Sequence, residues 1–215
     1  ARAKVAATLA RYTGLSPEYV ELANLRVEIQ RFCKELLRSE GRTVGRLDSR
    51  FTGVDRSGVA EQPEFDPSLA AIRPPYTAAL NDLVRRTLRF ESDLPYHILG
   101  GGIGRWDWGS AGDGFADTGD ALRQAFAKNP HMRVFVASGY FDLATPYFAT
   151  EYTLEHLNLP AGQQDRVVRR YYNVGHMMYI DVKELAALRK DVAAFIAQAV
   201  GPASTGESSR QSRPN

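Results

Sequence analysis

The chain has 215 residues, of which 44% are hydrophobic and 24% are charged, and its formal net charge is +2. These values are ordinary for a globular protein and exclude a collagen, a coiled-coil rod and a wholly disordered chain. No stretch approaches the roughly 20 apolar residues that span a bilayer, so no membrane partner is expected. Basic residues are scattered among carboxylates, and no basic block predicts nucleic-acid binding.

A single cysteine, Cys33, leaves no partner for an intramolecular disulfide and no cysteine cluster for a metal. The spacing of His97, His131 and His156 is not that of metal ligands, so we expect no metal site and no cofactor. The chain begins without an initiator Met or a signal-peptide pattern, and Ala1 falls inside an expected helix. We therefore expect the sequence to be a segment of a longer protein.

The first part of the chain is predicted to be mainly helical. Ser16 precedes Pro17, the pattern of an N-cap followed by proline at the first helical position. Apolar residues at helical spacing over residues 29–37 predict an amphipathic helix that Gly41 closes. Residues 42–68 are rich in Gly, Asp, Arg, Ser and Pro, and predict a loop with no more than one short strand.

A second helix is expected to follow Pro74 and Pro75. Its apolar face would consist of Tyr76, Leu80, Leu83, Val84 and Leu88. Upstream of it, Arg46, Asp48 and Arg50 alternate along a possible strand, which indicates an ion-pair cluster rather than catalysis. Downstream, Trp106 and Trp108 are expected either to pack between the two parts of the molecule or to line a substrate groove.

The second part alternates helix and strand. The predicted order is a helix capped by Asp117 or Thr118, a strand over 132–137, a helix over 146–158, a strand over 167–173, and a helix capped by Asp181. This rhythm is typical of a parallel sheet with covering helices. The predicted organisation is thus a mainly helical cap at 1–95, an α/β core segment at 96–200 and a disordered tail at 201–215.

Two chemically useful residues follow the two predicted parallel strands. Asp142 lies in the turn after the first strand, and His176 comes directly after Gly175 at the end of the second. Ligands and catalytic groups collect at the carboxyl ends of strands in such sheets. A carboxylate that binds one ring nitrogen of a histidine fixes its tautomer and leaves the other nitrogen free to accept a proton. On spacing alone, however, a turn-capping aspartate and a structural histidine also fit.

The stretches VFVASGYFDLATPYFATEYTLEHL and YYNVGHMMYID, with the helix that follows, resemble the C-terminal part of the serine carboxypeptidases, the S10 peptidase family. Residues 44–51 and the Gly-rich stretch before Trp106 also resemble bacterial members, so the likeness covers most of residues 16–198. The resemblance implies an α/β-hydrolase fold, with Asp142 as the triad acid and His176 as the general base. It further implies Met177 near the leaving-group pocket, peptide C-termini as substrates, and a periplasmic or secreted location. Tyr140 is a second pocket candidate.

The family's nucleophile is missing. In α/β hydrolases the serine precedes the acid on a Gly-x-Ser-x-Gly elbow, and no serine before Asp142 has glycines at that spacing. We therefore expect this chain to hold the acid and the base of a carboxypeptidase and to be inactive alone. An ester hydrolase or acyltransferase on the same fold, or a non-catalytic interaction module, remains an alternative.

Two other patterns are weak. The glycines at 100–102 and 104 lack the last glycine of a dinucleotide-binding loop, since Arg105 stands there, and no P-loop lysine follows. Asp113, Asp117 and Asp120 do not have the spacing of a calcium loop, and we interpret them as capping and turn residues.

Overall fold

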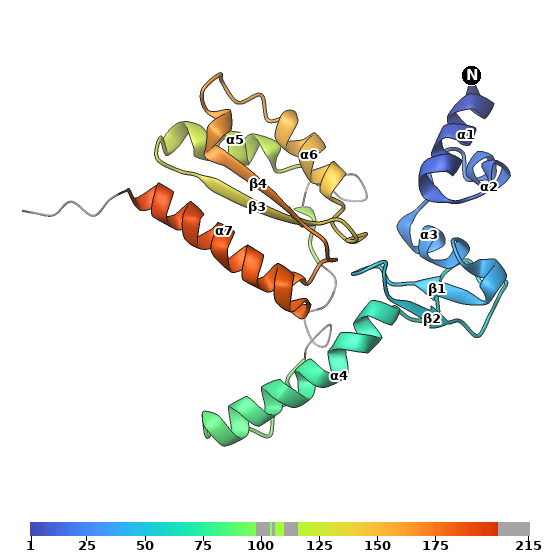
Figure 1. Ribbon diagram of the computed structural model, residues 1–215, viewed down its shortest axis with the longest axis horizontal. Helices are drawn as coiled ribbons and strands as arrows, with labels where there is room; N and C mark the ends of the chain where they lie inside the picture. Colours follow the sequence, from blue (N-terminus) through green and yellow to red (C-terminus); the bar gives the residue numbers. More distant parts are fainter. Residues whose placement is uncertain (98–103, 105, 110–115, 202–215) are drawn as a thin grey trace, which may run out of the picture.

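The computed structural model describes residues 1–97, 104, 106–109 and 116–201. Their elements form a mixed α/β arrangement with a small parallel sheet (Figure 1). The glycines at 100–102, Asp113 and nearly all of the predicted disordered tail lie outside the described residues. No helix in the described part of the chain is long and apolar enough to cross a membrane.

The N-terminal part begins with three helices, α1 (Arg2–Thr13), α2 (Pro17–Leu22) and α3 (Ile29–Glu35). The Ser16 side chain accepts a hydrogen bond from the Tyr19 amide, which confirms the predicted N-cap. A 3-10 turn, η1 (Arg38–Glu40), follows α3 and ends at Gly41, whose φ of 65° lies in the left-handed region that glycine adopts without strain.

Residues 42–68 hold more structure than predicted. Strands β1 (Arg42–Val44) and β2 (Thr52–Val54) pair as an antiparallel hairpin, so the expectation of at most one strand was wrong. Residues 45–51 form the loop of this hairpin rather than a strand. The loop is held closed by a hydrogen bond from the Gly45 amide to the Phe51 carbonyl.

The next helix starts earlier than predicted. Helix α4 (Pro67–Asp82) begins where the Asp66 side chain accepts hydrogen bonds from two amides of the first turn, and it continues into a π-helical turn, η2 (Leu83–Thr87). Pro74 and Pro75 therefore lie inside the helix and do not start it. They are tolerated because this stretch is exposed, so the carbonyls that lose a helical partner can bind water.

The C-terminal part follows the predicted order of α5 (Gly119–Lys128), β3 (Val134–Gly139), α6 (Tyr147–Glu155), β4 (Val167–Tyr172) and α7 (Val182–Val200), with 3-10 turns η4 (Gln164–Arg166) and η5 (Met178–Ile180). Strands β3 and β4 are parallel and in register from Val134 opposite Val167 to Gly139 opposite Tyr172. The Asp181 side chain caps α7, as predicted.

Helices cover both faces of this sheet, with α5 and α6 on one side and α7 on the other (Figure 1). Successive side chains of β4 point to opposite faces of the sheet and contact different helices. The Tyr171 hydroxyl donates to Glu151 of α6, whereas the Tyr172 hydroxyl donates to Asp191 of α7 at 3.0 Å. The Phe195 ring of α7 lies 5.4 Å from the ring of Phe135. Part of the apolar surface of α7 is uncovered, since Val182, Leu185 and Ile196 are exposed.

Candidate active site

The loops after β3 and β4 bring Asp142 and His176 together. The Nδ1 atom of His176 lies 2.8 Å from Oδ2 of Asp142, although the two residues are 34 positions apart. Asp142 is buried, while the His176 side chain is 43% exposed. The juxtaposition predicted from the ends of two parallel strands is therefore present in the structure.

The Asp142 carboxylate has further partners in its own loop. Its Oδ1 accepts hydrogen bonds from the amides of Ala144 at 2.7 Å and Thr145 at 2.9 Å, and its Oδ2 accepts one from the Thr145 hydroxyl at 2.6 Å. Burial raises the pKa of Asp142, but the bonds from Thr145 and His176 outweigh burial, so the pKa lies below its usual value. The group is thus an anion fixed against the imidazole.

Two glycines allow the two loops to approach each other. A Cβ atom on Gly139 would lie 2.3 Å from the Gly175 carbonyl oxygen. A Cβ atom on Gly175 would lie 2.3 Å from the Leu47 carbonyl oxygen and 2.4 Å from Cβ of Asp48. Both distances are far below van der Waals contact, so a side chain at either position would push the histidine loop away from its neighbours.

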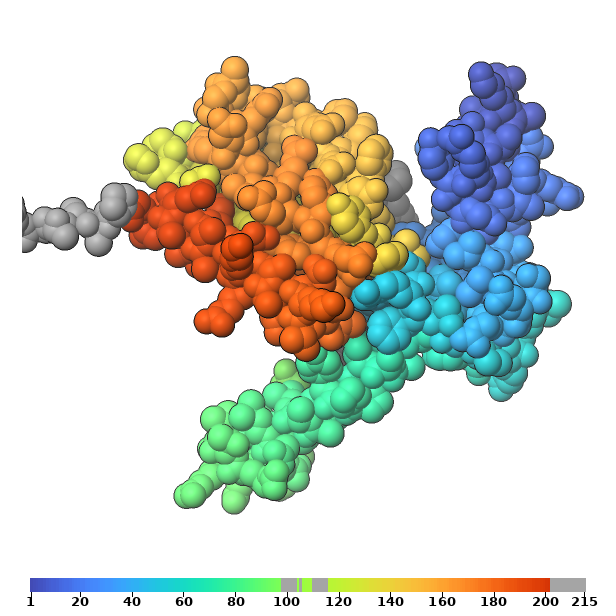
Figure 2. All heavy atoms as spheres, in the orientation of Figure 1, coloured from blue at the N-terminus to red at the C-terminus, as the bar shows by residue number. Residues whose placement is uncertain are grey.

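The hairpin loop at 45–51, in the N-terminal part of the chain, is hydrogen-bonded to the loops that follow β3 and β4. The His176 amide donates to the Leu47 carbonyl at 2.7 Å, and the Leu143 amide donates to the Arg46 carbonyl at 3.0 Å. The Ser49 amide donates to the Phe141 carbonyl at 2.9 Å. Figure 2 shows this contact as the place where the cyan hairpin meets the yellow and orange loops.

Asp48 is central to this contact. It is 1% exposed, and its Oδ2 accepts a hydrogen bond from the Gly175 amide at 3.0 Å. The Arg50 guanidinium binds both carboxylate oxygens of Asp48, and its Nη1 also donates to the Asn173 carbonyl at 2.9 Å. The predicted ion pair between Asp48 and Arg50 is present, but Arg46 is not part of it. Nothing in the sequence pattern predicted that this pair supports the histidine loop.

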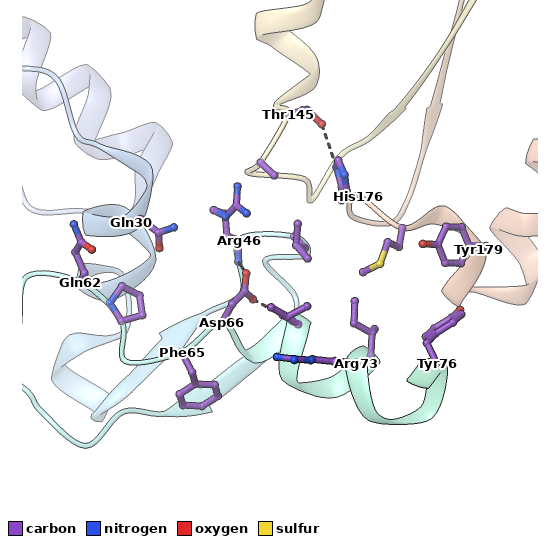
Figure 3. A pocket seen from close by; sticks show the side chains of 16 residues that line it. Gln30, Arg46, Gln62, Phe65, Asp66, Arg73, Tyr76, Thr145, His176 and Tyr179 are labelled. Atoms are coloured by element: carbon purple, nitrogen blue, oxygen red, sulfur yellow. Dashed lines mark hydrogen bonds between the residues drawn. The ribbon is translucent and has the colours of Figure 1, made fainter. Parts of the chain in front are cut away.

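A cavity of about 890 Å³ opens beside the acid–base pair, between the C-terminal loops, the hairpin and α4 (Figure 3). Thr145, His176 and Met177 line one side of it, while the place of Met177 near a leaving-group pocket stays a prediction. The opposite wall comes from α4 and its approach, and includes Asp66, Leu69 and Ile72. Arg46 also lines the cavity, and nothing in its sequence context predicted this position.

The other candidates lie elsewhere. Tyr140 is not among the described residues that line the cavity, and instead packs against Tyr147 and Tyr171 with ring centroids 5.5 and 5.8 Å away. Trp106 and Trp108 contact each other and are exposed, so the expected packing between the two parts was wrong. The described residues contain no cluster of three His, Cys, Asp or Glu side chains that could hold a metal ion.

Asp117 has the turn role expected of it, whereas Asp120 lies within the first turn of α5 and does not act as its cap. Oδ1 of Asp117 accepts a hydrogen bond from the Gly119 amide at 2.8 Å, at the start of α5. Asp120 pairs with Arg123 on the exposed side of the same helix. Thr118 stands at the N-cap position but makes no side-chain capping bond.

Comparison with family models, with curated proteins and with solved structures found no match to this chain.

Proposed function

We propose that the chain carries the acid and the general base of a serine-type carboxypeptidase. The observation that supports this best is the 2.8 Å contact between a buried Asp142 carboxylate and Nδ1 of a half-exposed His176, beside a cavity. The strand-end placement of the pair and the S10-like sequence around it point to peptide hydrolysis in particular. The C-terminal part then belongs to an α/β-hydrolase core, and residues 1–95 form its cap.

In this mechanism His176 works through Nε2, because Nδ1 is bound to Asp142. Nε2 takes the proton of a serine hydroxyl as the serine oxygen bonds to the carbonyl carbon of the last peptide bond. The carbon–nitrogen bond then breaks, and Nε2 gives the proton to the leaving amine. Water repeats the cycle and frees the serine. Asp142 stays ionised and stabilises the imidazolium that forms between these steps.

On this proposal, the serine comes from outside these 215 residues. None of the described residues that line the cavity is a serine, and the sequence has no Gly-x-Ser-x-Gly elbow before Asp142. Thr145 cannot replace it, since its hydroxyl donates to Asp142 on the Nδ1 side of the ring. We therefore place the nucleophile on a segment that packs against the C-terminal part.

The test uses the longer polypeptide encoded by the same reading frame upstream of Ala1 together with this chain. Release of the last residue from an N-acylated dipeptide is measured for that enzyme and for Asp142→Asn and His176→Gln. We expect turnover to fall by about 10⁴ for the aspartate variant and about 10⁶ for the histidine variant. His156→Gln, at an exposed position on the C-terminal end of α6, is the matched control. Unchanged turnover in either site variant would remove that residue from the mechanism.

A second measurement separates peptidase from esterase and from interaction module. The 215-residue chain alone should release no amino acid and should not react with a serine-directed phosphonate, whereas the longer enzyme should do both. An enzyme that cleaves only ester analogues, or a reading frame that starts at this chain, would contradict the carboxypeptidase assignment.

A further inference from the structure

Two arginines line the cavity beside the acid–base pair. Arg46 comes from the hairpin loop and Arg73 from α4, on the opposite wall (Figure 3). The same cavity has an apolar side formed by Leu69, Ile72 and Met177. A ligand that fills it would thus meet an apolar surface and one or two positive charges close to His176.

The backbone of Arg46 is held on both sides. Its amide donates to Oδ2 of Asp66 at 3.2 Å, and its carbonyl accepts from the Leu143 amide at 3.0 Å. The side chain is half-buried, and Figure 3 shows its guanidinium pointing away from Asp66 into the cavity. The Arg46 guanidinium is therefore held by a fixed backbone in the cavity beside Asp142 and His176.

The Arg46 guanidinium makes no hydrogen bond and no ion pair with any residue that the structure describes. Asp66, a carboxylate that also lines the cavity, uses its oxygens for the amides of Arg46, Ser68 and Leu69 and for the Ser68 hydroxyl. Arg50 in the same hairpin loop differs, because Asp48 neutralises it by a two-point contact. Of the two arginines in the hairpin loop, Arg46 and Arg50, only Arg46 has its guanidinium donors available to a ligand.

A half-buried guanidinium has lost part of its hydration, and a carboxylate is the partner that matches its two parallel N–H donors. We propose that Arg46, supported by Arg73, binds the side-chain carboxylate of the substrate, so that the site prefers peptides with an acidic C-terminal residue. This inference rests on the proposed function for the nature of the ligand. It concerns binding, however, and can hold or fail without hydrolysis.

The test measures binding of three probes to the 215-residue chain by titration calorimetry at low ionic strength. The probes are N-acetyl-Phe-Glu, N-acetyl-Phe-Gln and N-acetyl-Phe-Gln amide, which carry two, one and no carboxylates. We expect the glutamate peptide to bind about tenfold more tightly than the glutamine peptide, the typical effect of one charge-assisted hydrogen-bonded pair. Added salt should reduce this preference.

Variants test which arginine causes the preference for the glutamate peptide. Arg46→Gln should abolish it, Arg46→Lys should keep part of it, and Arg73→Gln, at an exposed position on α4, should weaken it without affecting the fold. Arg123→Gln, an exposed arginine on α5, is the control and should change nothing. His176→Gln should keep the preference while abolishing turnover of the longer enzyme, which distinguishes this proposal from the catalytic one.

Two results would overturn the inference. The first is equal affinity for the glutamate and glutamine peptides; weaker binding of the amide would then assign the contact to the terminal carboxylate. The second is a preference for glutamate that survives in both Arg46→Gln and Arg73→Gln.

Discussion

Replacing Asp48 with asparagine tests how the hairpin supports the histidine loop. The carboxylate accepts hydrogen bonds from the Arg50 amide at 3.0 Å, from the Arg50 guanidinium at 2.7 and 2.9 Å, and from the Gly175 amide at 3.0 Å. An asparagine of the same shape presents an NH₂ group where one of these oxygens stood. At least one donor, either the guanidinium or the Gly175 amide, then faces another donor in a buried place.

The size of the effect follows from burial. Breaking a fully buried ion pair costs about 3–5 kcal/mol, because one charge remains without compensation. The Arg50 side chain is 34% exposed, so water can solvate part of the orphaned guanidinium. We therefore expect Asp48→Asn to lower the free energy of unfolding by about 2–3 kcal/mol. The NMR signal of the His176 amide should also shift, because this amide donates a hydrogen bond to the carbonyl of Leu47, the residue before Asp48.

Equilibrium unfolding in urea at pH 7 measures the first effect, and the amide and imidazole NMR signals of His176 report the second. Asp120→Asn is the matched control. Asp120 also pairs with an arginine, Arg123, but its side chain is 88% exposed, and such pairs add little to stability. A loss below about 0.5 kcal/mol, with unchanged His176 signals, would refute the supporting role of Asp48.

Three further predictions concern other contacts. The lowered pKa of Asp142 means that its contribution to stability is present above its unfolded pKa of about 3.9 and is lost as the pH falls through the folded pKa. Asp142→Asn should therefore flatten the acid side of the stability–pH curve, and an unaltered curve would contradict this. Gly175→Ala should cost about 1–3 kcal/mol by thermal unfolding, because its Cβ meets the Leu47 carbonyl; a neutral result would show that the loop can move. Lys34→Met should cost about 3–5 kcal/mol in urea by leaving buried Asp55 unpaired, and adding Asp55→Leu should recover most of it.

The local elements were largely predictable. Ser16 and Asp181 cap their helices as expected, because an N-cap depends on residues only two or three positions away. The strands β3 and β4 were recognised from short apolar runs between turns, and the structure shifts the first of them by two residues at each end. The start of α4 was missed because Pro74 and Pro75 read as a beginning, whereas the cap that starts the helix is Asp66.

Some long-range contacts of the site could be predicted from the sequence, and others could not. Asp142 and His176 could be paired from sequence, since parallel strands place their carboxyl ends side by side. The contact between Asp48 and Gly175 spans 127 positions and joins a hairpin loop to a strand end. No periodic pattern in the sequence predicts such a contact. The alternation of Arg46, Asp48 and Arg50 did indicate an ion pair, but not which arginine would remain outside it.

The two ring nitrogens of His176 have different surroundings, and this limits what the chain can do alone. On the Nδ1 side, the imidazole of His176 meets a carboxylate that is already bound by two amides and a hydroxyl, so this side is fixed and closed. The ring is half-exposed and lines the cavity, so a group that enters the cavity can reach it. Such a pair orients and transfers protons but forms no bond to a substrate by itself. Under the proposed function, its chemistry depends on a serine hydroxyl held by a further segment, and the distance from that hydroxyl to Nε2 would decide between an enzyme and a binding module.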